Sequence, residues 1–465
     1  MARLDPVLEY AESDFGNAVS RYLAFLRIPS ISTDPAYKDE VRRAGKYLED
    51  EFRSLGFEAT LHETAGHPIL LAHHEGEAPG APHLLYYGHY DVQPPEPLEL
   101  WDSPPFEPAI VDGPHGKRVV ARGAVDDKGQ VMTFLEAFRA WKAVHGALPA
   151  SVTALLEGEE ECGSVSLPGF LEKHATALRE ASIAIITDTN AWDIDTPAIT
   201  YRLRGNVYME VTLSGPSRDL HSGLYGGAVV NPLNALIEIL GQLHGRDGRV
   251  QVPGFYDDVE DLSAGERKAW SALNFDEGGF LGEAGLTQSI GEAHYSLLER
   301  LWARPTCDLH GLWGGYTGPG SKTVIANHAS AKLSFRTVPN QKPAKIMKGL
   351  KQFLDARTPP DCKWRVEQFG GSEGILVPAD GPYMQAARAG LKDIFKKAAA
   401  MVGCGGSIPV VGDLQKQLGL DSILVGFGLS DDRIHSPNEK FELKCLKNGI
   451  LSHAAILDRM GKVVL

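Results

Sequence analysis

The sequence predicts an α/β protein into which a second, α+β domain is inserted. At 465 residues the chain exceeds the ~250 to 300 residues at which one hydrophobic core usually stops growing, so two domains are expected. Short apolar runs that lead directly into polar side chains alternate with helical patterns, which is typical of an α/β sheet buried on both faces. After about residue 204 apolar and polar residues alternate instead, which indicates strands with one face in water.

Three apolar runs predict central strands of the first domain, at residues 84–87, 152–156 and 183–186. Each run leads into His, Asp or Glu side chains that could bind a ligand. A helix is expected after Asp127, because apolar residues recur at helical spacing between residues 131 and 141. Sites in open α/β sheets form at the carboxyl ends of the strands, so these polar side chains are candidates for one common site.

The inserted domain is expected to open with an alternating strand at residues 207–213. Asn231 and Pro232 then provide an N-cap and a first position for a helix. A Gly- and charge-rich excursion follows at about residues 245–300. A second strand-helix-strand unit is predicted beyond it, at residues 333–338, 343–354 and 364–369.

The chain is expected to return to the first domain near Tyr383, through a helix, the turn at residues 403–407, a strand at 423–427 and a final helix. The predicted domain boundaries divide the chain into residues 1–204, 205–378 and 379–465.

The composition favours a cytoplasmic enzyme. With 46 basic and 60 acidic residues the net charge is −14, which argues against a nucleic-acid partner. Five widely spaced cysteines form no Cys-x-x-Cys pair, and a reducing compartment is the simplest interpretation. The first residues are acidic rather than signal-like, and no stretch approaches the ~18 apolar residues of a membrane span.

Two histidines and several carboxylates have the pattern that a two-metal hydrolase needs. A pair of cations ~3.5 to 4 Å apart requires a bridging carboxylate, and Asp126 is the natural bridge. His89 and Asp188 would complete the ligand set of one metal ion, and Glu161 and His435 that of the other. Asp91, two residues after His89, could hold the other imidazole nitrogen and fix the tautomer.

Taken singly, each of these residues is better interpreted as a capped or solvated polar side chain at a strand end. The acidic run 159–161 alone would be interpreted as a solvated turn. Together, the ordered set favours a metal site. The adjacent acids Asp126 and Asp127 would also be costly to hold near other carboxylates without a cation.

The chain resembles the M20 family of dinuclear metallopeptidases, and most of all its dipeptidase branch, which includes carnosinase. The resemblance covers nearly the whole chain in family order. It rests on GHYDVQP at 88–94, WDSPPF at 101–106, RGAVDDKG at 122–129, LEGEEECGS at 156–164, DLHSGLYGG at 219–227, SFRTVPN at 334–340, CGGSIPV at 404–410 and HSPNE at 435–439.

The resemblance implies a zinc-peptidase-like catalytic domain with an inserted ferredoxin-like lid that mediates homodimerisation. Counting back from Gly163 and Ser164, it makes Glu160 the general base and Glu161 a metal ligand; the extra acid Glu159 leaves room for a register shift by one.

The resemblance also implies roles for residues of the lid and of the Gly-rich turn. His221 would stabilise the oxyanion from the partner subunit, although alone it would be interpreted as a surface loop histidine. Arg336 would bind a substrate carboxylate, and Thr323 and Ser407 would contact the substrate.

The leading hypothesis is hydrolysis of dipeptides or short peptides with two divalent metal ions per subunit. Zinc is expected, and manganese or cobalt also suit these ligands. The nearest rival is an N-acyl amino acid deacylase with the same chemistry, and a rival of another class is a non-catalytic metal-binding scaffold. A nucleotide-binding enzyme is excluded, because the sequence has no phosphate-binding loop motif.

Overall fold

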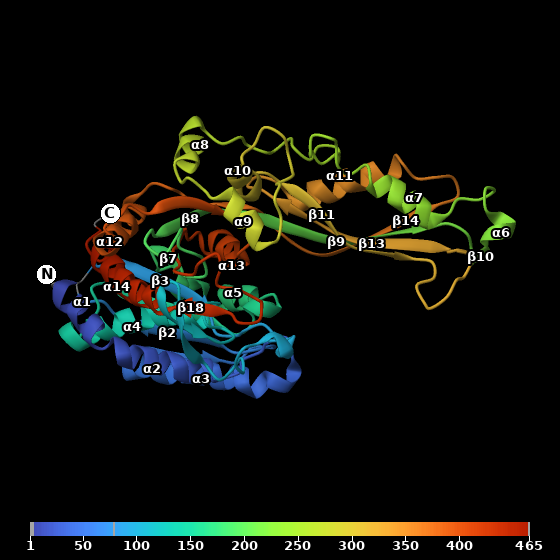
Figure 1. The fold of residues 1–465 in the computed structure, drawn as a ribbon. Helices are drawn as coiled ribbons and strands as arrows, with labels where there is room; N and C mark the ends of the chain where they lie inside the picture. Colours follow the sequence, from blue (N-terminus) through green and yellow to red (C-terminus); the bar gives the residue numbers. More distant parts are fainter. Residues whose placement is uncertain (1–3, 78–79, 464–465) are drawn as a thin grey trace. The chain divides into compact units, whose positions relative to one another are not determined.

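The computed structural model of the protein describes residues 4–77 and 80–463, which form two compact units (Figure 1). The first unit consists of Met1–Tyr201, Val377–Val402 and Asp413–Leu465, and the second of Arg202–Leu376 and Gly403–Gly412.

A mixed sheet forms the centre of the first unit. Its strands are, in spatial order, β1 (Glu58–His62), β2 (Ile69–His74), β6 (Ser151–Glu157), β3 (His83–His89), β7 (Ile183–Ile186), β17 (Ser422–Leu424) and β8 (Ala198–Leu203). The four strands from β6 to β17 are parallel, and the outer pairings are antiparallel. The predicted central strands at 84–87, 152–156 and 183–186 are confirmed.

Helix α4 (Lys128–His145) packs on this sheet beside α14 (Leu443–Met460), and α12 (Pro382–Phe395) packs against α14 (Figure 1). Tyr86 of β3 lies between the rings of Phe134 and Phe138, with centroids 5.2 and 5.0 Å away. Burial of these aromatic side chains holds the middle of α4 against the middle of β3.

Further helices among the described residues are α1 (Leu4–Ser13), α2 (Phe15–Leu26), α3 (Lys38–Ser54), α5 (Leu167–Leu178), α6 (Ser222–Tyr225), α8 (Ala264–Ser271), α9 (Glu277–Glu283), α10 (Leu297–Trp302) and α13 (Pro409–Asp413). A small antiparallel sheet in the first unit has the order β18 (Lys440–Glu442), β5 (Gly116–Val120) and β4 (Ala109–Gly113).

The core of the second unit is a four-stranded antiparallel sheet on which two helices pack. The strands lie in the order β11 (Thr306–Gly314), β13 (His328–Thr337), β9 (Gly205–Ser214) and β14 (Lys363–Ser372). Helix α7 (Pro232–Leu240) follows β9, and α11 (Pro343–Asp355) follows β13. This βαββαβ order is ferredoxin-like, so the predicted α/β fold with an inserted α+β lid is confirmed.

The alternating pattern that predicts this sheet has a simple physical basis. Val207, Met209 and Val211 of β9 point to one face and are buried, together with Leu236 of α7 and Phe353 of α11. The residues between them are partly exposed on the other face. The insert between α7 and β11 contains α8, α9 and α10.

Two details differ from the sequence prediction. The strand expected at 423–427 ends at Leu424. Residues 403–412, expected in the first domain, group with the second unit, because Arg204 donates hydrogen bonds from its backbone N–H to Cys404 O and from Nε to Gly405 O. β16 (Ala400–Cys404), which leads into this segment, pairs with β8.

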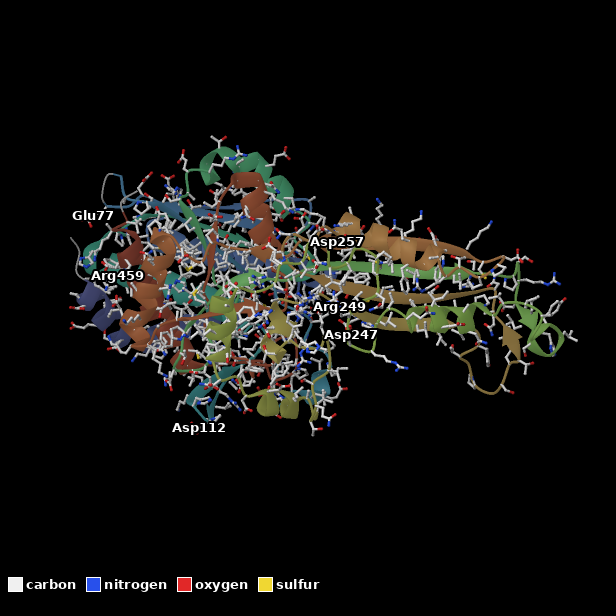
Figure 2. All side chains as sticks on the ribbon, turned by 90° about the horizontal axis from the view of Figure 1, so that it is seen from above. Glu77, Asp112, Asp247, Arg249, Asp257 and Arg459 are labelled. Carbon is white, nitrogen blue, oxygen red and sulfur yellow. The ribbon has the colours of Figure 1, made fainter. Side chains whose placement is uncertain are left out.

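The short strand β15 (Ile375–Leu376) pairs with the end of β8, and β10 (Leu220–His221) pairs with β12 (Val324–Ile325). Charged side chains such as Glu77, Asp112 and Arg459 project into solvent (Figure 2). Within the described residues, helices long and apolar enough to cross a membrane are absent.

Candidate metal centre

The predicted metal ligands lie at or just beyond the carboxyl ends of neighbouring parallel strands. His89 is the last residue of β3, Glu161 lies in a 3-10 turn (Glu160–Cys162) after β6, and Asp188 lies two residues beyond β7. Asp126 lies in the loop before α4, and His435 in the loop before β18. Because β6, β3 and β7 are adjacent and parallel, their ends place these side chains at one edge of the sheet.

The structure brings the five residues together as two groups of three that share one member. One group is His89, Asp126 and Asp188, and the other is Asp126, Glu161 and His435; within each group one ligand atom per residue lies within 4.8 Å of the others. The carboxylate of Asp126 faces both histidines. Its Oδ1 lies 3.1 Å from His89 Nε2, and its Oδ2 lies 3.0 Å from His435 Nε2. A carboxylate that offers one oxygen to each side is the arrangement required of a bridging ligand.

The two sides of the site differ in exposure. The side chain of His89 is 1% exposed, whereas that of His435 is 52% exposed. His435 Nε2 also lies 3.2 Å from Glu161 Oε1. The side chain of Glu161 is buried, so on this side of the site it is His435 that is open to solvent.

The cluster carries more negative charge than its histidines balance. Burial and the charge of Asp126 raise the pKa of Asp188 to about 7. Burial and the charges of Asp188 and Glu161 raise the pKa of Glu160 to about 9. Hydrogen bonds to Asp126 and Glu161 raise the pKa of His435 to about 10. Such mutual repulsion between buried carboxylates is relieved by bound cations, so the donor set fits two divalent ions.

The pKa of Asp126 is shifted in the opposite direction. Burial would raise it, but hydrogen bonds from His435 and His89 hold the pKa of this carboxyl below its usual value. Asp126 is therefore the carboxylate of the cluster that stays ionised, as a bridging ligand must.

Asp91 links the two ligand-bearing strands. Its carboxylate accepts hydrogen bonds from the backbone N–H groups of Glu161, at 3.0 Å, and of Glu160, at 3.3 Å. His89 Nδ1 lies 3.1 Å from the backbone oxygen of Asp91 and 3.4 Å from its Oδ1. With Nδ1 turned toward these oxygens, Nε2 of His89 is directed at Asp126.

The run of three acids separates into distinct positions. Glu159 is buried, and its carboxylate accepts hydrogen bonds from the N–H groups of His67 and Ser166, both at 2.8 Å. It thus holds two loops together, while Glu161 belongs to the second ligand group. This geometry supports the sequence register in which Glu160 and Glu161 lie at the site and the extra acid does not.

Sequence reasoning missed Glu439, the last residue of the HSPNE string. Its buried carboxylate accepts hydrogen bonds from Arg122 Nη1 at 2.8 Å and from the N–H groups of Gly123, Val125 and Asp126 at 2.9, 2.9 and 3.1 Å. Glu439 therefore fixes the backbone of the loop that carries Asp126. Its place in a string matched for His435 is the one signal that could have pointed to it.

The four predicted substrate contacts belong to the second unit, and the ligand groups belong to the first. His221 is exposed and accepts a hydrogen bond from Gly223 N–H at its Nδ1. Thr323 lies next to this segment, because its backbone oxygen accepts a hydrogen bond from the N–H of Ser222, the residue after His221. Arg336 is in β13 opposite Asn206 and Thr306. Ser407 follows the Gly405 turn and is partly buried.

The fold and the paired ligand groups define an α/β metallopeptidase. The family model described as Peptidase family M20/M25/M40 matches residues 85–459, and the chain belongs to this family. The predicted resemblance is thereby confirmed. Membership implies divalent metal ions, for which the two ligand groups are the candidates.

Relatives and solved structures agree over nearly the full length. The chain is 30% identical to the Cys-Gly metallodipeptidase DUG1 of Candida albicans, with 99% of this chain and 98% of the relative covered. It is 28% identical to the human Beta-Ala-His dipeptidase, covering 94% and 89%. The structure of an M20 family metallo-carboxypeptidase of Sulfolobus solfataricus, Sso-CP2, superposes with a TM-score of 0.83 at 31% identity, covering 96% and 99%.

Proposed function

We propose that the protein is a dipeptidase that hydrolyses the peptide bond of dipeptides or short peptides with two divalent metal ions per subunit. The observation that carries the proposal is Asp126, whose two carboxylate oxygens face His89 and His435. His89 and Asp188 would hold one ion with Asp126, and Glu161 and His435 the other. The similarity to enzymes named as dipeptidases supports the substrate class.

The bound ions would polarise the scissile carbonyl and lower the pKa of the attacking water. The remaining steps fall to the side chains. Glu160 takes the proton of the attacking water and passes it to the leaving amine. Its carboxyl is buried among Asp188, Glu161 and Asp91, so positive charge in the site is needed to keep it ionised. Asp91 holds the backbone of Glu160 and orients His89.

Residues of the second unit would bind and orient the substrate. Arg336 pairs with the substrate's terminal carboxylate, and Thr323 and Ser407 donate hydrogen bonds. His221 donates a hydrogen bond to the oxyanion, and we place it at the metal centre of a partner subunit in a homodimer. Its exposed ring supports this role, because it is accessible to a second chain.

The protein is proposed to be cytoplasmic. None of its five cysteines, all within the described residues, forms a disulfide, which suits a reducing compartment. We propose zinc as the native metal, with manganese and cobalt as candidates that the same imidazole and carboxylate ligands accept.

Metal analysis coupled to a substrate panel tests the proposal. The purified protein is stripped of metal and reloaded with zinc, manganese or cobalt, and each form is assayed on dipeptides and on acetylated and succinylated amino acids. Release of free amino acids from dipeptides, with two ions per chain, is the expected result. Faster release of acetate or succinate would make the protein a deacylase, and binding of metal without turnover would make it a scaffold.

A further inference from the structure

The second unit contains a cavity of about 630 Å³ beside the first residues of β11. The cavity is lined by the start of β11, by parts of the insert and by four arginine side chains. The four are Arg204, Arg246, Arg300 and Arg304.

Only one of these arginines is neutralised within the part of the chain that the structure describes. Arg304 donates two hydrogen bonds of 2.7 Å to Glu292 and lies 3.2 Å from Asp261. Arg300 donates to the hydroxyl of Ser289 at 3.1 Å and to a backbone oxygen, but to no carboxylate. Arg246 is exposed and makes no ion pair among the described residues. Two carboxylates, those of Glu292 and Asp308, also line the cavity, so its four arginines leave an excess of positive charge in a chain whose net charge is −14.

Arg204 is the most deeply placed of the unpaired group. Its Nε donates to Gly405 O at 3.0 Å and its Nη1 to Arg304 O at 3.5 Å, so both acceptors are neutral carbonyls. Burial and the positive charge of Arg336 lower the pKa of Arg204 to about 10. The carboxylate of Asp308, which also lines the cavity, offsets this lowering only in part, so a bound anion would further stabilise Arg204 beside Arg336.

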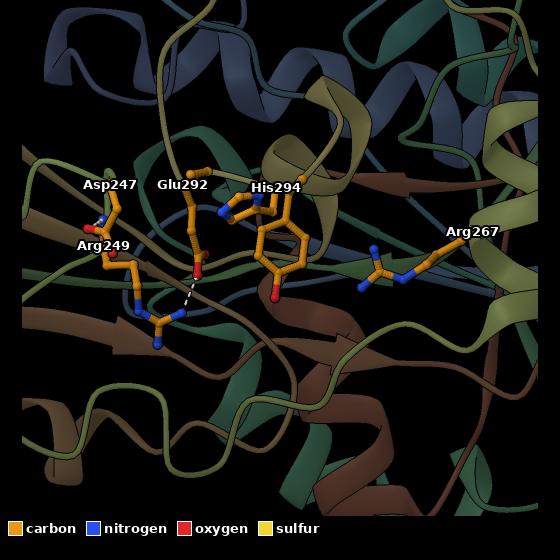
Figure 3. Close-up of a pocket in the computed structure, with 7 residues that line it drawn as sticks. Asp247, Arg249, Arg267, Glu292 and His294 are labelled. Carbon is orange, nitrogen blue, oxygen red and sulfur yellow. Dashed lines mark hydrogen bonds and ion pairs between the residues drawn. The ribbon is translucent and has the colours of Figure 1, made fainter.

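A neighbouring cavity of about 330 Å³ offers a comparison, because the two arginines that line it form ion pairs with glutamates. There Arg249 pairs with Glu292 at 2.7 Å, as the dashed line in Figure 3 marks, and Arg267 pairs with Glu299. Each guanidinium of that cavity thus pairs with a carboxylate, although Glu292 is shared with Arg304. Among the described residues, Arg204, Arg246 and Arg300 of the larger cavity make no such ion pair.

The larger cavity adjoins the proposed carboxylate-binding residue. Thr306, which lines the cavity, is the register partner of Arg336 across β11 and β13. Arg336 also pairs with Asn206, two residues beyond Arg204. A substrate whose terminal carboxylate lies on Arg336 would therefore direct its last side chain toward the arginines of the cavity.

We propose that this cavity binds a second carboxylate of the substrate, so that the enzyme prefers short peptides with an acidic C-terminal residue. The inference rests on the proposed dipeptidase function. Planar guanidinium groups bind carboxylates through paired, charge-assisted hydrogen bonds, and Arg246 and Arg300 have donors to spare for them.

A matched substrate series tests the inference on the metal-loaded enzyme. Values of kcat/KM are compared for Ala-Glu against Ala-Gln and for Ala-Asp against Ala-Asn. We expect kcat/KM to be about tenfold higher for the acidic peptide, which corresponds to the free energy of one charged hydrogen bond. Arg300→Gln and Arg246→Gln should each reduce the preference while leaving kcat/KM for Ala-Gln unchanged. Arg365→Gln is the control, because Arg365 is 65% exposed on β14 and pairs with Glu367.

Equal rates on acidic and neutral peptides, or a preference that survives both cavity substitutions, would overturn the inference while leaving the dipeptidase function intact. Arg246 is exposed and makes no ion pair among the described residues, so its variant stays informative if Arg300→Gln is unstable. Should no dipeptide be hydrolysed, the proposed function fails. The cavity is then tested directly by titrating Ala-Glu and Ala-Gln into the metal-loaded protein, and equal affinities would refute the inference.

Discussion

Replacing Glu439 by glutamine tests whether the loop that carries Asp126 is held by one buried carboxylate. The amide keeps the size of the side chain but removes the negative charge that faces Arg122. It also replaces an acceptor oxygen by an NH₂ group that points at backbone N–H donors. Loss of one partner from a buried pair costs about 3 to 5 kcal/mol, and we expect the free energy of unfolding to fall by that amount.

The same substitution should also weaken metal binding. Glu439 accepts directly from the N–H of Asp126, so its loss releases the backbone of the bridging residue. Substitution of residues that support metal ligands typically lowers affinity by roughly 10- to 100-fold, and we expect a zinc dissociation constant raised by that factor. Burial raises the pKa of Glu439 to about 7, so the comparison belongs at pH 8, where the wild-type carboxyl is ionised.

Glu136→Gln separates the two effects. Glu136 lies within α4 and outside the ligand loop, and its side chain is 3% exposed. It pairs with Arg21 at 2.6 Å and with Arg139 at 3.2 Å. Urea unfolding of the metal-free proteins should show a comparable loss for both variants. Competitive zinc titration should show weakened binding for Glu439→Gln alone. Equal zinc affinity of wild type and Glu439→Gln would refute the claim that Glu439 positions Asp126.

Three further predictions follow from the site and the core. Glu160→Gln should leave metal content unchanged and lower kcat by about 10²- to 10⁴-fold, measured by dipeptide hydrolysis and elemental analysis; retained turnover would exclude Glu160 as the base. In the metal-free protein His435 has a raised pKa, so its stabilising contribution is complete below about pH 6.5 and is lost as the pH rises through about 10. Thermal unfolding of wild type and His435→Gln across that window should converge at the alkaline end, and a constant difference would contradict the assignment. Burial lowers the pKa of His453 to about 3, so the free energy of unfolding should fall as the pH drops below about 6.5. His453→Leu should reduce this acid sensitivity, measured by urea unfolding at about pH 4.5 and pH 7.

Much of the fold could be predicted because burial leaves a clear mark in the sequence. β3, β6 and β7 are buried along nearly their whole length, and each is a continuous apolar run. β9 has one buried face and alternates accordingly. The strand expected at 423–427 is shorter in the structure. An apolar run indicates buried residues but not strand pairing, and residues beyond Leu424 are buried without pairing as a strand.

The ligand groups were predictable for a different reason. Metal ligands must be His, Asp or Glu, and the ends of adjacent parallel strands meet at one edge of a sheet. Residues that support the ligands carry no such signature. Glu159 and Glu439 act by accepting hydrogen bonds from backbone N–H groups, which every residue possesses. Their acceptor role depends on loop conformations that only the folded chain defines.

The two unpredicted contacts of residues 403–412 have the same origin. Arg204 attaches this segment to the second unit through the carbonyl oxygens of Cys404 and Gly405. A carbonyl acceptor can belong to any residue, so neither the Gly-rich composition nor the spacing of the turn reveals which unit holds it.

The short stretch from His435 to Glu439 has a consequence for how the enzyme matures. This stretch provides one candidate ligand, His435, and also the carboxylate of Glu439, which shapes the loop of Asp126, 313 positions earlier (439 − 126). During synthesis the ribosome must therefore release the chain as far as Glu439 before the metal centre can assemble. A nascent chain that ends before His435 would lack part of the candidate ligand set.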